Sequence, residues 1–139
     1  MSTFKDIDAA RAYFSGDRFA VENGMVIDEL TDEGSVCSFA VTSRHKNAMG
    51  NAMGGAIFTL ADFAFAVAAN HRHHPTVAQQ VSVNFLNAGR GARLIARARP
   101  KKDGRGSCVY NVDITDDEGR DVAQIVITGF KLPESPLEQ

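Results

Sequence analysis

Cysteine is scarce in this sequence, with two residues among 139. Cys37 and Cys108 lie in strand-like runs, and neither has another cysteine or a histidine at metal-ligand spacing. We therefore expect buried, reduced thiols and neither a disulfide nor a zinc site. Reduced thiols are typical of a cytoplasmic protein.

A membrane-spanning segment is also missing. No stretch reaches the roughly 18 charge-free apolar residues that would suggest a membrane helix, and Asp62 interrupts the most apolar stretch. The N-terminal segment carries Lys5, Asp6, Asp8 and Arg11 where a signal peptide would need an apolar run. The sequence therefore predicts a soluble protein that is not exported.

Neither sign of charge dominates the sequence. Its 15 basic and 17 acidic residues are scattered and give a formal net charge of -2. Because no field of one sign covers the molecule, neither nucleic acid nor an anionic membrane is expected as a partner. Internal repeats and linkers are also absent, so we expect residues 1–139 to form a single domain.

The sequence does contain a regular succession of apolar patterns. A short amphipathic helix is predicted over about residues 3–15, with Ser2 or Thr3 as its N-cap. Residues 56–70 predict a helix that is apolar all round, because they are rich in alanine, phenylalanine and leucine. Strands are predicted at residues 25–31, 35–41, 77–86, 93–99, 107–115 and 122–132. A disordered tail is expected at about residues 133–139.

These elements predict an α+β fold in which a curved antiparallel β-sheet wraps one long central helix. The sheet can cover only one side of that helix, and its outer strands leave open edges. Association through the remaining surface would cover both, so we expect a homodimer or a larger homo-oligomer.

Asp62 is the main candidate for chemistry. It is the only Asp, Glu, Lys or Arg between Lys46 and Arg72, and it lies about two turns inside the apolar helix. A carboxylate in such a helix loses solvation and must be paired, protonated or functional. The alternative is a structural aspartate whose oxygens accept hydrogen bonds from the sheet.

Glycines before the helix provide a second candidate feature. Gly50, Gly54 and Gly55 allow the backbone to approach a ligand closely, and the first N–H groups of the helix suit an oxyanion or a polarised carbonyl. Without Asp62 nearby, an ordinary turn would explain these glycines.

The loop and the helix together resemble a known family. The positions aligned with the family pattern are Asn47, Gly50, Met53, Gly54, Gly55, Phe58, Leu60, Ala61, Asp62, Ala64, Phe65, Ala66, Ala68 and Asn70. This pattern resembles the PaaI-type acyl-CoA thioesterases of the hotdog superfamily, whose hallmark is an Asn-x-x-Gly-x-x-His-Gly-Gly loop followed by a helix bearing Leu-Ala-Asp. A looser similarity continues through residues 81–89 and the 104–106 hairpin to Phe130.

The resemblance implies a hotdog fold that hydrolyses an acyl-CoA thioester, with coenzyme A as part of the substrate and no separate cofactor. It implies that Asp62 attacks the thioester or activates water, across the interface of a dimer or a dimer of dimers. Gly54, followed by Gly55, would offer its N–H to the thioester oxygen. Asn47 would help to place the nucleophile or the water.

Two positions depart from the family pattern. Met53 replaces the usual histidine, and a thioether cannot donate a hydrogen bond to the thioester carbonyl. Some members also carry a serine or threonine on the following strand, whereas this sequence has Ala78, Gln79 and Gln80 there. Activity could therefore be lower, or directed to a different acyl group.

Basic residues in the second half are candidates for coenzyme A phosphates. Arg90, Arg93, Lys101, Lys102 and Arg105 could reach a phosphate at a sheet edge, although a solvated hairpin would also explain each of them. The three histidines within residues 71–74 are possible metal ligands. No further ligand converges on them in sequence, so no metal site is predicted.

Two other functions remain open at this point. A hotdog hydratase or dehydratase would need a histidine paired with an acid. A non-catalytic acyl-CoA-binding protein would have lost turnover together with the histidine at position 53. The acyl group also remains open: Phe19, Phe58, Phe63 and Phe65 could form an apolar or aryl pocket, but phenylalanine is ordinary core material.

Overall fold

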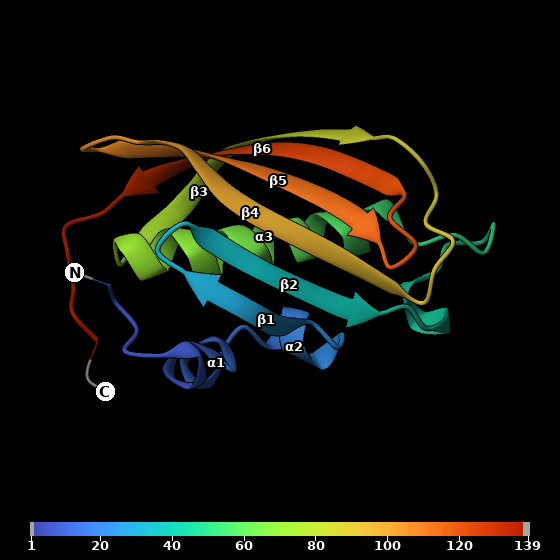
Figure 1. Ribbon diagram of the computed structural model, residues 1–139, viewed down its shortest axis with the longest axis horizontal. Helices are drawn as coiled ribbons and strands as arrows, with labels where there is room; N and C mark the ends of the chain where they lie inside the picture. The colour runs from blue at the N-terminus through green and yellow to red at the C-terminus, as the bar shows by residue number, and fades with distance from the viewer. Residues whose placement is uncertain (1, 138–139) are drawn as a thin grey trace.

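A computed structural model describes residues 2–137. One long helix lies inside a curved, six-stranded antiparallel sheet with the order β1-β2-β4-β5-β6-β3 (Figure 1). The strands are β1 (Val26–Thr31), β2 (Gly34–Ala40), β3 (Thr76–Phe85), β4 (Arg93–Asp103), β5 (Ser107–Asp116) and β6 (Asp121–Lys131). The helices are α1 (Ile7–Phe14), α2 (Arg18–Glu22) and α3 (Gly54–Arg72), with a 3-10 turn, η1 (Ser43–His45), before α3. This is the predicted α+β arrangement of a curved sheet around one helix.

Alternation along the central strands creates the inner face of the sheet. In β5, Tyr110, Val112 and Ile114 are buried at every second position and point toward α3, because successive side chains of a strand face opposite sides. The β1–β2 turn depends on Gly34, which has a φ of 145° and whose added Cβ would lie 2.0 Å from the carbonyl oxygen of Ala98. Only glycine fits this close approach to β4.

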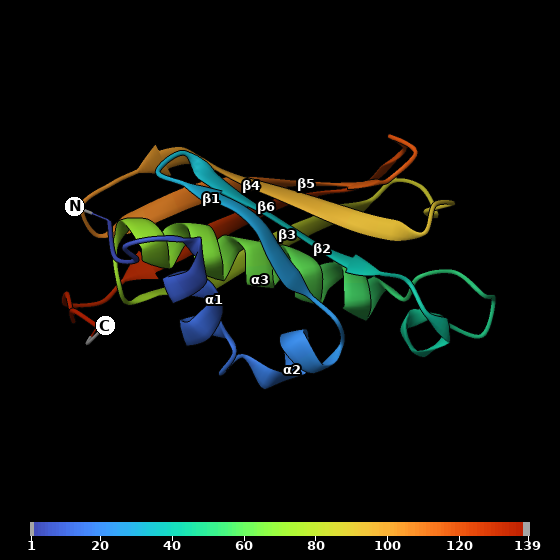
Figure 2. The same cartoon turned by 60° about the horizontal axis from the view of Figure 1, so that its bottom comes forward.

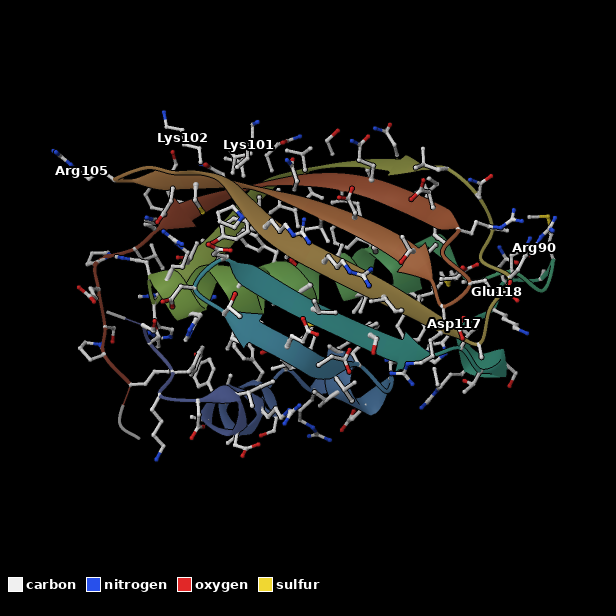
Figure 3. The ribbon with its side chains drawn as sticks, viewed as in Figure 1. Arg90, Lys101, Lys102, Arg105, Asp117 and Glu118 are labelled. Atoms are coloured by element: carbon white, nitrogen blue, oxygen red, sulfur yellow. The ribbon has the colours of Figure 1, made fainter. Side chains whose placement is uncertain are left out.

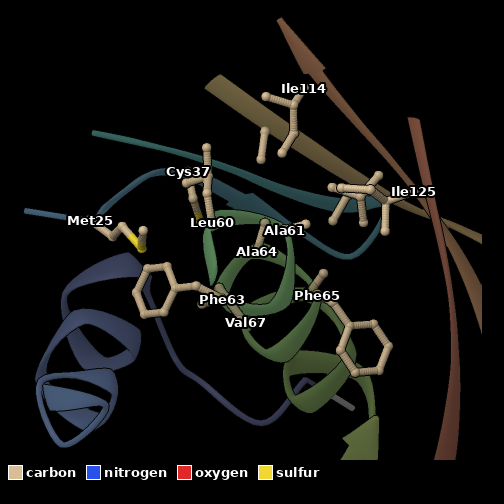
Figure 4. Close-up of a cluster of buried hydrophobic side chains, with 14 of the residues drawn as sticks. Met25, Cys37, Leu60, Ala61, Phe63, Ala64, Phe65, Val67, Ile114 and Ile125 are labelled. Carbon is tan, nitrogen blue, oxygen red and sulfur yellow. The ribbon is translucent and has the colours of Figure 1, made fainter. Parts of the chain in front are cut away.

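Helix α3 supplies the apolar centre of the domain (Figure 4). Leu60, Ala64 and Val67 are fully buried. Phe65 lies against Gly129 of β6, where an added Cβ would come within 2.8 Å of the phenyl ring. The glycine therefore makes room for an aromatic ring between helix and sheet.

Helices α1 and α2 lie on the side of α3 that faces away from the sheet (Figure 2). Phe14 of α1 packs edge-to-face on Phe63 of α3, with 6.0 Å between the ring centroids. This cover is incomplete, because Gly55, Phe58 and Asp62 form an exposed stripe at i, i+3 and i+7.

The N-terminal region differs from the prediction in two respects. The cap of α1 is Asp6, whose carboxylate accepts the N–H of Ala9, so the predicted caps Ser2 and Thr3 were wrong. Thr3 is instead tied to the end of α3, where its hydroxyl donates to the carbonyl of Asn70. Helix α2 was not predicted, since five residues are too few for a helical repeat to show.

The tail is described as far as residue 137, and residues 138 and 139 of the predicted tail lie outside the described part. Residues 133–137 form no helix or strand, but the N–H of Ser135 donates to the carbonyl of His74 at 2.9 Å. Cys37 and Cys108 are free and buried. None of the helices within residues 2–137 is long and apolar enough to cross a membrane.

The two edges of the sheet are not equally protected. At the β1 edge, the guanidinium of Arg11 donates to the carbonyl of Ile27 from both Nε and Nη2, at 3.1 and 2.8 Å. The β3 edge is a ten-residue strand that pairs with β6 on one side and exposes most of its side chains. It is therefore the edge on which another strand could pair.

Candidate active site

The loop before α3 is closed by Asn47. Its side-chain Oδ1 accepts the N–H groups of Met49 and Asn51 at 3.0 and 3.2 Å, and its own N–H donates to the carbonyl of Asn51 at 2.8 Å. Gly50 completes the turn with a φ of 83°. These bonds use the oxygen of the Asn47 amide, so the amide N–H₂ can still donate to a ligand.

The loop ends at Met53, which is the N-cap residue of α3. The N–H of Met53 donates to the carbonyl of His45 at 2.7 Å, and its own carbonyl accepts the N–H groups of Ala56 and Ile57. The N–H groups of Gly54 and Gly55 lie before the first hydrogen bonds of the helix, so they have no acceptor within α3. They form the positive end of the helix dipole. The start of α3 is thus suited to stabilise negative charge on an oxygen.

A groove leads to this helix start. It has a volume of about 350 Å³ and lies between the loop and the segment after β3, lined by Asn51, Gly54, Phe85 and Gly89. A Cβ on Gly54 would meet the ring of Phe85 at 3.2 Å. Glycine at this position therefore keeps the N–H close to the surface of the groove.

Asp62 lies on the exposed stripe of α3, beside a recess. Its own sheet covers the opposite side of the helix, while α2 leaves a recess of about 320 Å³ between itself and α3. Desolvation in this recess raises the pKa of Asp62 from its ordinary value, and the negative charge of Asp17 in the same recess raises it further. The result is a carboxylate that is more basic than an ordinary surface aspartate.

Asp62 and Gly54 cannot meet within one chain. They lie eight residues apart on the same helix, which corresponds to about 12 Å at 1.5 Å per residue. A carboxylate and an oxyanion donor that act on one carbonyl must each lie about 3 Å from the reacting atoms. One chain therefore cannot bring both candidate groups to the same carbonyl.

The candidate basic residues lie at opposite ends of the fold (Figure 3). Arg90 follows Gly89 at the end where α3 begins, beside Asp117 and Glu118. Lys101, Lys102 and Arg105 lie on the β4–β5 hairpin, at the end where Arg72 of α3 donates to Asp103 at 3.0 Å. A single chain does not bring Arg90 together with Lys101, Lys102 and Arg105.

The loop before α3 also contains a histidine that the sequence analysis did not consider. His45 is 5% exposed; its Nδ1 accepts the N–H of Thr42 at 3.0 Å, and its Nε2 donates to the carbonyl of Asn23 at 2.7 Å. Nδ1 is engaged at the N-cap of η1, and Nε2 holds this segment to the end of α2. His45 therefore does not supply the donor that Met53 lacks.

The histidines at residues 71–74 do not converge. Nε2 of His71 lies 3.4 Å from a carboxylate oxygen of Asp32, His73 bonds to the carbonyl of Leu132, and His74 bonds to the carbonyl of Ser135. Within residues 2–137, no three histidine, cysteine or acidic side chains are grouped closely enough to hold a metal ion.

Helix α2 is the part of the site that sequence reasoning missed. It places Asp17, Arg18 and Phe19 beside Asp62, although nothing in their spacing links them to α3. Burial also raises the pKa of Asp17. The sequence analysis named Phe19 among four phenylalanines that could form a pocket, but nothing in the sequence placed it, or Asp17 and Arg18 before it, beside Asp62.

A central helix wrapped by one curved antiparallel sheet, with a glycine-rich loop at the start of that helix, defines a hotdog-fold protein. Comparison with known families matches residues 49–123 to the thioesterase superfamily. The acyl-coenzyme A thioesterase PaaI of Escherichia coli is 31% identical over 115 residues, which cover 82% of this chain and 82% of that protein. The chain therefore belongs to the thioesterase superfamily, is of the PaaI type and is a thioester hydrolase.

Solved structures agree with this assignment. The structure of the E. coli PaaI protein superposes with a TM-score of 0.86 at 27% identity, covering 92% of this chain and 94% of that one. A hypothetical thioesterase of Streptococcus pneumoniae, solved with coenzyme A, gives a TM-score of 0.80 at 30% identity and covers 87% and 98% of the two chains.

Proposed function

We propose that this protein hydrolyses an acyl-CoA thioester at a site shared by two copies of the chain, with Asp62 from one copy and the N–H of Gly54 from the other. The observation that carries this proposal is the separation of about 12 Å between the two half-sites on α3. The similarity to PaaI of E. coli and to a thioesterase solved with coenzyme A supports acyl-CoA as the substrate.

Edge pairing through β3 would assemble the two half-sites. The guanidinium of Arg11 blocks part of the β1 edge, whereas β3 is long, exposed and paired on one side. Two β3 strands paired antiparallel around a two-fold axis would form one continuous sheet and place the two α3 helices in opposite directions. Each Gly54 would then lie beside the middle of the partner helix. A homodimer is the smallest assembly that completes the site, and a homotetramer would be a pair of such dimers.

The reaction needs one new bond and one broken bond at the thioester carbon. Asp62 either removes a proton from the attacking water or attacks the carbon itself to form an anhydride that water then opens. In the first route, the C–S bond then breaks and the coenzyme A thiolate takes up the proton held by Asp62. In the second route, the C–S bond breaks as the anhydride forms, and the thiolate takes up a proton from the water that opens the anhydride. The N–H of Gly54 stabilises the oxygen that becomes negative in the transition state.

Asn47 and Met53 would act around this centre. The free amide N–H₂ of Asn47 would orient the water or the carboxylate, because its oxygen is held by the loop. Met53 is 54% exposed at the start of α3 and contributes an apolar wall in place of a donor. Stabilisation of the oxyanion therefore depends on the backbone N–H groups of Gly54 and Gly55.

The phosphates of coenzyme A would bind to cations from both chains. The two-fold pairing of β3 would reverse the partner, so its β4–β5 hairpin would lie at the end where α3 of the first chain begins. Lys101, Lys102 and Arg105 of one chain would then lie near Arg90 of the other and form one basic patch for the phosphates.

Asp62→Asn tests the catalytic role. We expect kcat for acyl-CoA hydrolysis to fall by at least about 10³-fold with little change in KM, because the amide can neither attack nor accept the proton. The raised pKa means that ionised Asp62 is disfavoured in the folded state. Any stability it contributes is present below its unfolded pKa and lost as pH rises through its folded pKa. The melting temperature of Asp62→Asn near pH 7 should therefore not fall.

Glu33→Gln is a matched control, since it neutralises an exposed carboxylate in the β1–β2 turn. A folded Asp62→Asn protein with near wild-type kcat would exclude the mechanism. If calorimetry shows that the wild type binds acyl-CoA but no hydrolysis is detected, the non-catalytic acyl-CoA-binding alternative is favoured. This alternative arises because Met53 cannot donate the hydrogen bond of the family histidine. Near the start of α3, the described residues offer the hydratase alternative no free histidine, because both ring nitrogens of His45 are engaged.

A further inference from the structure

Asp116 is the only acidic residue that is buried in the part of the chain that the structure describes, and the proposed mechanism does not use it. It is the last residue of β5 and is 1% exposed. A carboxylate is costly to bury unless other groups donate hydrogen bonds to it. Its partners therefore show which segments it holds together.

Backbone N–H groups are the donors that surround this carboxylate. Oδ1 accepts the N–H groups of Glu118 and Arg120 at 3.0 and 2.9 Å, and both belong to the β5–β6 turn that follows Asp116. Oδ2 accepts the N–H of Arg90 at 2.8 Å, which lies 26 residues earlier in the chain. The N–H of Arg90 contributes most to holding the pKa of Asp116 below its ordinary value, followed by that of Arg120. Asp116 is therefore ionised at neutral pH and joins the turn to a distant segment.

Residues 86–92 form this distant segment, the β3–β4 connection. Its first two N–H groups donate to one carbonyl of β6, at 2.9 and 3.3 Å. Its middle lies so close to the β5–β6 turn that an added Cβ on Gly91 would come within 1.7 Å of a carboxylate oxygen of Asp117. The bond from the N–H of Arg90 to Asp116 is made in this middle part. Strand β6 therefore holds the beginning of the connection, and Asp116 holds its middle.

The connection presents Arg90 to solvent at the end of the fold where α3 begins (Figure 3). Residues 85–89, which precede Arg90, line the groove that leads to Gly54. An arginine side chain is long and flexible, and a fixed backbone reduces the number of places that its guanidinium can reach. The carboxylate of Asp116 therefore limits where the charge of Arg90 lies relative to the groove.

We propose that Asp116 is a positioning residue for coenzyme A: its buried carboxylate holds the β3–β4 connection so that Arg90 faces the phosphates beside the groove. This inference rests on the proposed function, which assigns Arg90 to those phosphates. Because Asp116 is buried, it does not contact the substrate itself. It should influence the binding of the phosphate-bearing part of coenzyme A and leave the chemical step at the thioester unchanged.

Asp116→Asn keeps the size of the side chain but replaces one of its oxygens by an N–H₂ group. An amide has one acceptor atom, so it cannot accept from both the turn and Arg90 in the native geometry. The KM for acyl-CoA should rise about fivefold, and kcat should stay within about twofold. The loss of a negative charge would by itself strengthen phosphate binding, because like charges repel. A higher KM would therefore report displacement of Arg90 rather than loss of charge.

Glu118→Gln is the matched control, since it removes an exposed carboxylate from the same turn and keeps the N–H that donates to Asp116. It should not raise the KM for acyl-CoA. Both variants are assayed with the acyl-CoA that the wild type hydrolyses fastest among acetyl-, octanoyl- and phenylacetyl-CoA, and with the corresponding N-acetylcysteamine thioester. The second substrate has the same thioester but no phosphates. Its kcat/KM should change by less than about twofold in Asp116→Asn, because the groove wall near Gly54 keeps its bonds to β6.

Arg90→Gln completes a double-mutant cycle. On its own it should raise the KM for acyl-CoA by about tenfold, and adding Asp116→Asn to it should raise KM by less than a further twofold or about that. The proposal is overturned if either single variant leaves KM unchanged or if the two effects multiply. It is also overturned if Asp116→Asn lowers kcat/KM for both thioesters by the same factor, as a general loss of structure would. In all of these cases the proposed function stands, because the wild type hydrolyses acyl-CoA.

Two further outcomes also decide the question. If Asp116→Asn does not fold, Asp116→Ser takes its place, because a serine hydroxyl can still accept the N–H two residues later. If neither variant folds, the carboxylate is required by the whole fold and the proposal is overturned. If the folded wild type hydrolyses none of the thioesters, the proposed function fails, and calorimetry with coenzyme A decides the inference. Binding that is weakened by Asp116→Asn and not by Glu118→Gln supports it, and any other result overturns it.

Discussion

Replacing Gly54 by proline removes one N–H donor at the start of α3. Gly54 is the first residue of α3, where proline is well tolerated because its fixed φ suits a helix start. The preceding residue, Met53, has φ -64° and ψ 139°, which is the extended conformation that a following proline requires. The substitution therefore deletes the proposed oxyanion donor without breaking a helical hydrogen bond.

The expected loss is that of one oxyanion-hole donor, about 10²–10³ in kcat, or roughly 2.7–4 kcal/mol of transition-state stabilisation. Gly54→Ala is the matched control, since both variants add a Cβ about 3.2 Å from the ring of Phe85 but alanine keeps the N–H. Stopped assays of acyl-CoA hydrolysis with a thiol reagent compare the two proteins. Equal activity of the proline and alanine variants would refute the role of the Gly54 N–H.

Three further substitutions test other parts of the account. Asp17→Asn removes a negative charge that raises the pKa of Asp62, so the acid limb of the kcat/KM–pH profile should move to lower pH. If the limb does not move, the charge of Asp17 does not influence the catalytic carboxylate. Met53→His should keep or raise turnover because it adds a donor at the helix start, and a folded but inactive variant would show that the methionine shapes a different pocket. Gly129→Ala should destabilise the fold by about 1–3 kcal/mol in denaturant unfolding, because its Cβ would press on Phe65 and Cys108; an unchanged midpoint would contradict the packing described for α3.

The sheet and the central helix could be predicted because their patterns are long and regular. Side chains alternate between buried and exposed or half-buried along most of the strand around Tyr110, and alanine recurs along the helix around Leu60. Because each pattern repeats over several positions, it predicted the correct element from local sequence alone. Strand β4 extends to Asp103, four residues beyond the prediction. Charged lysines at its end obscured the strand pattern, because exposed hairpin strands need no apolar alternation.

The candidate site was only partly visible in the sequence. Asn47, Gly54 and Gly55 are close together because they are neighbours along the chain, so their arrangement followed from the loop and the helix start. Asp17 and Phe19 reach Asp62 only through the packing of α2 on α3, which depends on tertiary contacts such as that between His45 and Asn23. No local pattern encodes such a contact.

The exposure of Asp62 shows the same limit. Its position in an apolar helix predicted that the carboxylate loses solvation, but the sequence could not say which face of α3 the sheet would cover and which face would stay open. The separation of Arg90 from Lys101 likewise depends on which end of the sheet each connection reaches (Figure 3).

The central claim, that Asp62 and Gly54 of different chains form one site, can be tested by mixing two inactive variants. Asp62→Asn and Gly54→Pro proteins are unfolded together and refolded at equal concentration, and acyl-CoA hydrolysis is measured. In a mixed dimer, one of the two sites would combine an intact Asp62 with an intact Gly54. Random pairing should then restore about one quarter of wild-type activity, because half of the dimers are mixed and each has one intact site. A mixture no more active than the average of the two separate variants would contradict the shared site.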